Sequence, residues 1–230
     1  IDGMDLFSIR DTYLRKDSKL YFSAHFGTTS GYHQHYDCGT FVLDLMGERW
    51  AYDLGSDSYL LQNELGYPVY AIYRKRAEAH NMLVINPCAY TDRIETENGN
   101  FAPILDAKAN DKCGFVYADM SKVYIDAPKM ILGYYIGDNM SSVTMRNEFT
   151  LNVGRKCMWT MNTKGEIKID GNVAYVSRNG KTIKLEFICT GNKAMWHNAG
   201  NPKPLPTSPQ CPEQNKNEEF TQLKLTFNMP

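Results

Sequence analysis

Short stretches in which apolar and polar residues alternate recur along the chain. The clearest covers residues 19–26, where apolar side chains occupy every second position from Leu20 to Phe26. A period of two places these side chains on one face of an extended segment, which is typical of a half-buried strand. Similar patterns predict strands at 40–46, 49–54, 82–85, 165–169, 173–177, 182–189 and around 223–227.

Turn residues indicate how the later strands connect. Asp170-Gly171 and Asn179-Gly180 separate three neighbouring predicted strands, and such pairs tolerate the positive φ angles of tight hairpins. We therefore expect an antiparallel meander over residues 165–189. Helical character is weak and confined to residues 58–65. The sequence predicts an all-β fold, an antiparallel β-sandwich of stacked sheets, as one domain over residues 1–230.

Five prolines between positions 202 and 212 mark a loop at about residues 201–213. Proline has no N–H to donate to a ladder, and it stiffens the backbone. This segment is therefore expected to be extended, solvated and mobile.

Composition narrows the class of protein. The chain has 230 residues, of which 43% are hydrophobic, so it can build a sizeable core. Its 25 Lys and Arg residues balance 26 Asp and Glu residues, which argues against nucleic acid as a partner and requires any anion site to be local. No apolar run is long enough for a membrane span, and no signal peptide is recognisable. The start at Ile1 suggests a piece of a longer protein.

The six cysteines lie far apart, without a C-x-x-C pair, so neither a thiolate zinc site nor a dense disulfide framework is indicated.

Histidines supply the candidate chemistry. His33 and His35 flank Gln34, and residues two apart in an extended segment point to the same side, which suits a metal ion or a substrate carboxylate. His80-Asn81 opens another predicted strand, whereas His25 and His197 are isolated. Chance occurrence of the His-x-His pair is the alternative. The spacing does not choose among the downstream oxygen ligands Asp37, Asp44 and Asp53.

A cupin is the rival metal protein, because Gly27 precedes His33 and His35 at that barrel's usual spacing. The cupin motif then requires a glutamate where this chain has Gly39 and Thr40, and no second motif surrounds His80. A cupin dioxygenase is therefore rejected.

Four motifs in order closely resemble the heparinase II/III family of polysaccharide lyases. They lie between Gly31 and Asn86, and Cys38, Thr40 and Met82 depart from the usual residues. The motifs are Gly31-Tyr32-His33-Gln34-His35-Tyr36-Asp37-Cys38-Gly39-Thr40-Phe41-Val42-Leu43, Gly47-Glu48-Arg49-Trp50-Ala51, Asp53-Leu54-Gly55, and Tyr73-Arg74 before Ala79-His80-Asn81.

The resemblance implies a β-sandwich that follows an α/α toroid in the whole enzyme, with substrate in the cleft between them. It also implies a structural zinc ion near the cleft, bound by His35, Asp53 and His80, while His33 faces the cleft. Asp37 could orient His35 or could serve a turn.

These lyases cleave uronic-acid polymers by β-elimination, in which the C5 proton leaves while charge builds on the carboxylate. His33 could neutralise that carboxylate or act as the base. A tyrosine beside cations can exchange the proton, and Tyr73 best fits the motif. Tyr70, Arg74 and Arg76 could bind the acidic sugar, although a core tyrosine and a solvated cationic face are the plain alternatives.

The function expected from the resemblance is the C-terminal domain of a lyase acting on heparin- or heparan sulfate-like glycosaminoglycan. Its partners would be the polysaccharide and the N-terminal toroid of the same chain, and its location periplasmic or secreted. The alternatives are a non-catalytic carbohydrate-binding or interdomain module, and an alginate-type lyase domain. Trp50 is predicted to be core, while Trp159 and Trp196 could be core or a sugar platform.

Overall fold

The computed structural model describes residues 4–12, 18–28, 35–87, 101–151, 156–189 and 193–229. The strands are β1 Met4–Arg10, β2 Leu20–Gly27, β3 Phe41–Leu45, β4 Glu48–Ala51, β5 Leu83–Ile85, β6 Ile104–Ala109, β7 Gly114–Asp119, β8 Lys129–Gly137, β9 Ser142–Thr150, β10 Lys156–Thr163, β11 Glu166–Asp170, β12 Val173–Arg178, β13 Lys181–Glu186, β14 Ala194–Asn198 and β15 Thr221–Asn228. The helices are α1 Leu60–Asn63 and the 3-10 turns η2 Val69–Ala71, η3 Tyr73–Lys75 and η4 Ala77–Ala79.

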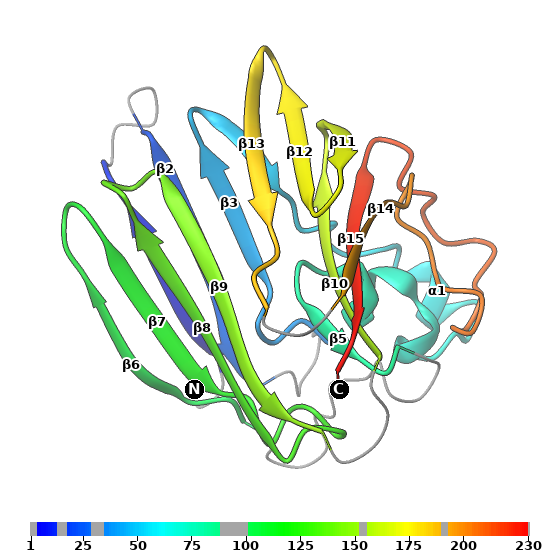
Figure 1. Cartoon of the computed structure of the whole chain (residues 1–230). Helices are drawn as coiled ribbons and strands as arrows, with labels where there is room; N and C mark the ends of the chain where they lie inside the picture. Colours follow the sequence, from blue (N-terminus) through cyan, green and yellow to red (C-terminus); the bar gives the residue numbers. More distant parts are fainter. Residues whose placement is uncertain are drawn as a thin grey trace. The chain divides into compact units, whose positions relative to one another are not determined.

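The strands form four sheets, in the orders β1-β2-β3-β4, β6-β7-β8-β9, β14-β15-β10-β5 and β11-β12-β13 (Figure 1). Their pairing is antiparallel, as in β1 with β2 and β10 with β15. The all-β, antiparallel class is therefore confirmed. The sequence predicted a stacked pair of sheets, whereas the structure has four sheets in two compact units. Unit 1 comprises Ile1–Arg49 and Ile94–Val153, and unit 2 comprises Trp50–Arg93 and Gly154–Pro230.

Unit 1 is organised around one tyrosine. Tyr134 on β8 is 1% exposed, and its ring lies 4.9 Å from Phe22 of β2 and 5.7 Å from Phe41 of β3, measured between centroids. The Tyr134 hydroxyl donates to the carbonyl of Gly39 at 2.6 Å. Buried aromatic rings contribute large apolar areas, and a bonded hydroxyl avoids the cost of an unpaired polar group. This contact joins the β2-β3 sheet to the β8 sheet.

Unit 2 is centred on β10. This strand pairs with β15, where Trp159 faces Leu225, and with β5, where Met158 faces Val84. Most of the apolar side chains here are buried, as the alternation around 223–227 predicted for Leu223 and Leu225. Trp50 and Trp196 are also buried, at 0% and 6% exposure, which confirms the core interpretation for both.

The predicted meander is present as β11, β12 and β13. Its turns carry positive φ angles at Gly171, Asn179 and Gly180, as the Asp-Gly and Asn-Gly pairs require. On β13, Ile183 and Leu185 are half-buried and alternate with exposed residues, so this strand keeps the predicted period of two without a fully buried face.

The proline-rich loop is less solvated than predicted. Pro202, Ser208 and Cys211 are buried, and the N–H of Leu205 donates to the carboxylate of Glu78 at 3.2 Å. Prolines remove backbone donors, but at least one remaining donor, the N–H of Leu205, bonds to a buried side chain of unit 2, and the N–H of Ser208 bonds to the carbonyl of Leu205 within the loop.

The pattern of residues 104–150 did not predict strands β6 to β9. On β8, buried Leu132 and Tyr134 alternate with Ile131 and Tyr135, which are apolar or aromatic too, so the period of two is obscured. The outward face of this sheet keeps large side chains at the surface, with Tyr135 50% exposed.

Within the described residues, no helix has the length and apolar character that a membrane crossing would require. The cysteines at 38, 113, 157, 189 and 211 are free thiols.

Candidate functional site

A histidine and a carboxylate meet in unit 2. The Nδ1 atom of His80 lies 2.8 Å from Oδ2 of Asp53, and the imidazole is fully buried while the Asp53 side chain is 33% exposed. The other oxygen of Asp53 accepts the N–H of Gly55 at 2.7 Å, which turns the carboxylate toward the histidine. Two predicted metal ligands, 27 positions apart in the sequence, are therefore in contact.

The backbone after His80 is held on both sides. Thr160 on β10 donates its hydroxyl to the carbonyl of His80 at 2.6 Å. The side chain of Asn81 donates to the carbonyl of Tyr52 at 2.9 Å and accepts the N–H of Asn162 at 2.8 Å. The asparagine of the His-Asn motif thus binds the segment that carries Asp53 to β10. This explains structurally why asparagine follows the histidine.

The segment that leads to His80 is a run of three short 3-10 turns, and a buried ion pair stabilises it. Arg76 and Glu78 are each 1% exposed, with Nε of Arg76 3.0 Å from Oε1 of Glu78. Arg76 also donates to the carbonyl of Tyr70 and to the hydroxyl of Ser208. Buried charges are tolerated only when they are paired and hydrogen-bonded, and here both conditions hold.

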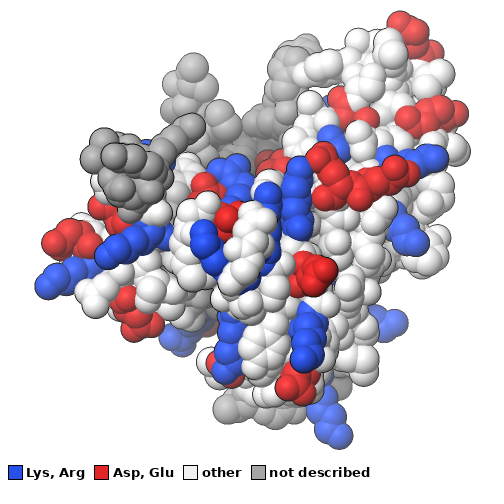
Figure 2. All heavy atoms as spheres, turned by 90° about the horizontal axis from the view of Figure 1, so that it is seen from above, with Lys and Arg blue, Asp and Glu red and all other residues white. Residues whose placement is uncertain are grey.

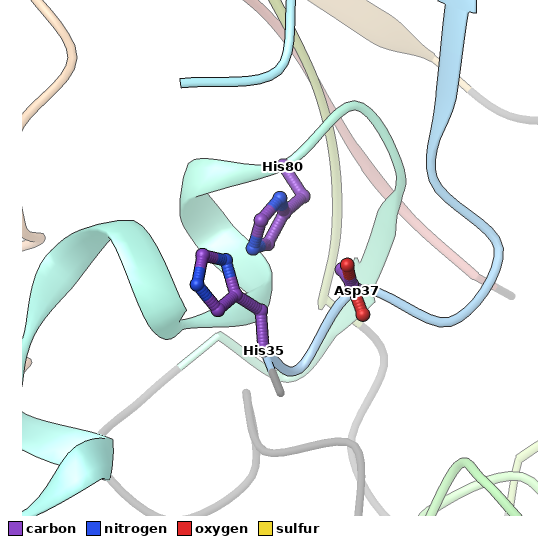
Figure 3. Close-up of side chains that lie close together, drawn as sticks. All are labelled: His35, Asp37 and His80. Atoms are coloured by element: carbon purple, nitrogen blue, oxygen red, sulfur yellow. The ribbon is translucent and has the colours of Figure 1, made fainter. Parts of the chain in front are cut away.

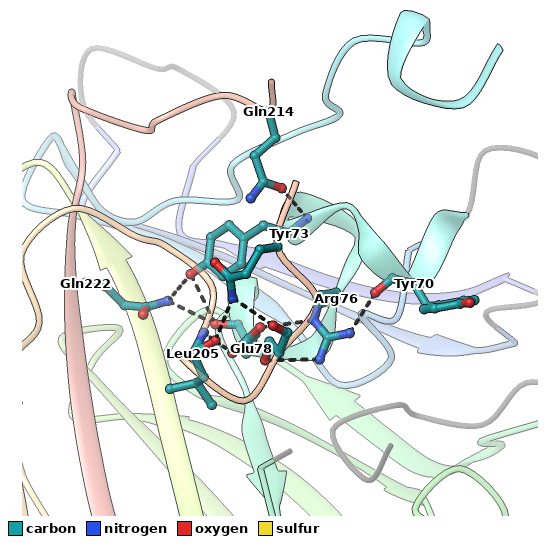
Figure 4. A network of polar contacts seen from close by, with 9 residues as sticks. Tyr70, Tyr73, Arg76, Glu78, Leu205, Gln214 and Gln222 are labelled. Carbon is teal, nitrogen blue, oxygen red and sulfur yellow. Dashed lines mark hydrogen bonds and ion pairs between the residues drawn. The ribbon is translucent and has the colours of Figure 1, made fainter. Parts of the chain in front are cut away.

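Tyr73 and Gln222 complete this network (Figure 4). The Gln222 amide donates to the Tyr73 hydroxyl at 3.2 Å and to the carbonyl of Glu78 at 3.0 Å. Gln222 lies on β15, so the network joins the turns η3 and η4 to the sheet of unit 2. Burial, reinforced by the charge of Glu78, raises the pKa of Tyr73 far above its ordinary value.

These contacts bear on the predicted substrate residues. Tyr73 is 1% exposed, Arg76 1% and Arg74 9%, and Arg74 donates to Asn217 at 2.8 Å. Their environment is the interior of unit 2 and gives them structural roles. It offers no support for proton transfer by Tyr73 or for sugar binding by Arg76. Tyr70, at 43% exposure, is the predicted substrate residue with an accessible side chain.

His35 and Asp37 lie on the segment before β3 in unit 1, and His80 follows η4 in unit 2 (Figure 3). Asp37 is 3.3 Å from Nδ1 of His25, measured at Oδ1. His25 lies on β2, and its contact with Asp37 was not predicted from the sequence. Predicting this contact would have required the pairing that brings residues 25 and 40 together.

Close packing determines the shape of this segment. Gly39 has a φ of +91°, and a Cβ atom there would lie 2.8 Å from Leu132. Glycine is therefore required by both the backbone and the space. Cys38 beside it is fully buried and donates its thiol toward the carbonyl of Gly27 at 3.6 Å. The Asp-Cys-Gly motif thus forms a tight turn that leads into β3.

His33 lies outside the described residues, so its predicted role stays a prediction. His35 is described, and its role as a zinc ligand also stays a prediction. Glu78 was not predicted, although its position two residues before His80 and two after Arg76 was visible in the sequence.

The donor atoms in unit 2 fit a zinc ion. Imidazole nitrogen and carboxylate oxygen are ordinary zinc ligands at about 2.0 to 2.2 Å. Two such atoms bound to one tetrahedral ion lie roughly 3.3 Å apart, whereas the 2.8 Å between His80 and Asp53 is the length of a hydrogen bond. The same contact could also orient His80 toward an ion through its other nitrogen.

Neither a protein-family model nor a curated protein matches the sequence. Solved structures do match the fold. Heparan sulfate lyase HepC from Pedobacter heparinus superposes with a TM-score of 0.68 at 10% identity, over 98% of this chain and 32% of that one. The heparinase III BT4657 gene product superposes with a TM-score of 0.66 at 13% identity, over 99% of this chain and 32% of that one.

The resemblance seen in four sequence motifs is therefore confirmed at the level of the fold. The chain spans about a third of the length of these two lyases, which fits a part of a larger protein. At 10 to 13% identity the match shows the fold alone, and the chemistry must be argued from the site residues.

Proposed function

We propose that this chain is the C-terminal β domain of a polysaccharide lyase that cleaves a uronic-acid-containing polysaccharide, such as heparan sulfate, by β-elimination. The observation that carries the proposal is the contact of Asp53 with His80. It occurs in a chain of which 98 to 99% matches the fold of one part of heparan sulfate lyase HepC and of heparinase III. Both residues belong to the sequence motifs that resemble the family, Asp53-Leu54-Gly55 and Ala79-His80-Asn81. We also propose that this chain has the β-sandwich architecture of that family.

This chain would supply the ligands of the metal site and a group that faces the substrate carboxylate. Asp53 and His80 would hold the zinc, with His35 as the third ligand that the motif predicts. A zinc ion held by these residues would supply a fixed positive charge and would stabilise the substrate cleft. His33 would face the carboxylate of the uronate, where a donor stabilises the charge that develops as the C5 proton leaves.

Substrate contacts from this chain are proposed for exposed Tyr70, while Tyr73, Arg74 and Arg76 maintain the turn that carries His80. The proton-transferring tyrosine would then come from the N-terminal toroid of the same protein. Because large polysaccharides occur outside the cytoplasm, we propose a periplasmic or secreted location.

The experiment uses the parent protein and follows the ultraviolet absorbance of the unsaturated product. Heparan sulfate, hyaluronan and alginate are supplied in parallel, so the alginate-type alternative is tested at the same time. His33→Ala should lower turnover by at least about 100-fold with an unchanged melting temperature. His197→Ala, on β14 and bonded to Thr226, is the matched control and should retain activity. A parent that cleaves none of these polymers contradicts the proposal.

A non-catalytic carbohydrate-binding module is the second candidate. It is favoured by the burial of Tyr73, which leaves the motif's own phenol without access to a sugar. Retained glycan binding without any product absorbance would identify this function.

A further inference from the structure

Charged residues of both signs are interspersed on the face of the molecule shown in Figure 2, and neither sign forms one continuous field there. With a formal charge of -1 for the whole chain, recognition of an acidic polymer must rely on local groups of cations. One such group lies in unit 2 and was not predicted from the sequence.

Two cations converge on one tyrosine. Lys164, in the turn between β10 and β11, has its Nζ atom 5.4 Å from the ring centroid of Tyr52 and 4.6 Å from that of Phe220. Arg178, the last residue of β12, has its Cζ atom 5.7 Å from the Tyr52 centroid and donates to the Tyr52 hydroxyl. The Tyr52 and Phe220 rings meet edge-on at 5.6 Å. Three separate segments thus place two positive charges around one half-buried phenol.

The acid that accompanies this cluster is at the surface. Lys164 donates to Oε2 of Glu219 at 2.6 Å, and the two side chains are 30% and 62% exposed. An exposed ion pair of this kind is weak, and solvent and salt screen it. Lys164 can therefore exchange Glu219 for another anion at little cost.

A hollow of about 440 Å³ opens beside the same lysine, and this volume is in the range of small-molecule sites. It is lined by Lys164, Gly165, Glu166, Ile167, Asn198 and Thr221. The amide of Asn198 and the hydroxyl of Thr221 are suited to sugar hydroxyls. The hollow therefore combines one cation, Lys164, with neutral hydrogen-bonding groups and with the carboxylate of Glu166, so an acidic sugar would have to bind at the Lys164 side.

We propose that Lys164, Arg178 and Tyr52 form a subsite for a pyranose unit that carries a carboxylate or a sulfate ester. The inference rests on the proposed function, because it identifies where unit 2 would bind the acidic polymer. A guanidinium offers paired N–H donors that match two oxygens of either anion, and an ammonium adds a point charge. The Tyr52 hydroxyl accepts a hydrogen bond from Arg178, and the Tyr52 ring lies beside Lys164, which also lines the hollow.

The test measures binding of a heparan sulfate hexasaccharide and a hyaluronan hexasaccharide to this chain by calorimetry at low salt. The first probe carries sulfate and carboxylate, and the second carries carboxylate alone. The double variant Lys164→Gln, Arg178→Gln should weaken binding by about tenfold or more. If the loss occurs only with heparan sulfate, the anion is a sulfate ester; a loss with both probes identifies the carboxylate.

A second variant separates binding from stability. Glu219→Gln removes the carboxylate that competes for Lys164, so it should tighten binding, by roughly two- to threefold. A purely structural role of the cluster predicts no such gain. The matched control is Lys184→Gln, from an exposed lysine on β13 that pairs with Glu186 at 2.8 Å, and it should leave affinity unchanged.

Unchanged affinity in the double variant, no tightening by Glu219→Gln, or no binding of either probe by the wild-type chain would each overturn the subsite. The lyase assay of the parent protein is independent. A parent that cleaves a uronan while the variants bind normally refutes the subsite alone. A parent that cleaves no uronan, with binding lost in the double variant, refutes the lyase and leaves the subsite in place.

Discussion

Arg76 and Glu78 show how burial decides the role of a charged residue. From the sequence, Arg74 and Arg76 were expected to bind an acidic sugar, with a solvated cationic face as the alternative. In the structure the Arg76 side chain is buried, and its N–H groups donate to Glu78, Tyr70 and Ser208. Residue type alone identifies a cation, whereas its partners determine whether the charge faces solvent or the core.

Arg76→Met should lower the free energy of unfolding by about 3 to 5 kcal/mol, because it leaves Glu78 buried without its partner. Urea denaturation followed by circular dichroism measures this. The matched control is Lys184→Met, which breaks an exposed pair with Glu186 and should leave stability nearly unchanged. Equal effects of the two substitutions would show that the buried pair has no special structural role.

Asp53→Asn should reduce zinc affinity by about 10- to 100-fold, whether Asp53 binds the ion or orients His80. Competition with a chromophoric chelator measures the affinity. Asp44→Asn is the control, because Asp44 was an equal candidate by spacing but pairs with Arg49 at 2.6 Å. A loss confined to the Asp44 variant would contradict the ligand assignment.

At the scale of elements, β10 organises unit 2. It lies between β15 and β5, it carries Thr160 and Asn162 to the backbone around His80, and its Cys157 is 2% exposed. A thiol in this position cannot ionise readily, and burial raises the pKa of Cys157 to about 12.

This shift predicts a pH dependence. The ordinary thiol pKa is 9.0, so above that pH the unfolded chain loses the Cys157 proton while the folded chain keeps it. The stabilisation is fully present below pH 9 and is lost as the pH rises toward 12. Unfolding free energies measured from pH 9 upward should fall less steeply in Cys157→Ala than in the wild type.

The control for this prediction is Cys189→Ala, because the Cys189 side chain is exposed. That variant should keep the wild-type slope. If the slope of Cys157→Ala also equals the wild-type slope, the burial argument fails.

At the scale of the whole molecule, the chain is an all-β protein that spans about a third of the length of the lyases that share its fold. We expect the chain by itself to bind zinc and acidic glycan without turnover.

Zinc should raise the melting temperature of the chain, and a chelator should reverse the increase. At about 100 times the Kd, a ligand that binds only the folded state adds about 2.7 kcal/mol of stability. Scanning calorimetry with zinc and with magnesium measures the effect, and magnesium should produce no shift because it prefers all-oxygen sites. A zinc-independent melting temperature would contradict the metal site.

The sequence by itself determined the strand class, the meander at 165–189, its turns and the family resemblance. These follow from local rules: a period of two, positive φ at Gly and Asn, and motif spacing. The tertiary structure alone decided that Asp53 reaches His80, that Arg76 is buried and that Lys164 and Arg178 meet at Tyr52. Such contacts join residues far apart in the sequence, and they depend on strand pairing and on the cost of burying charge, which no local pattern records.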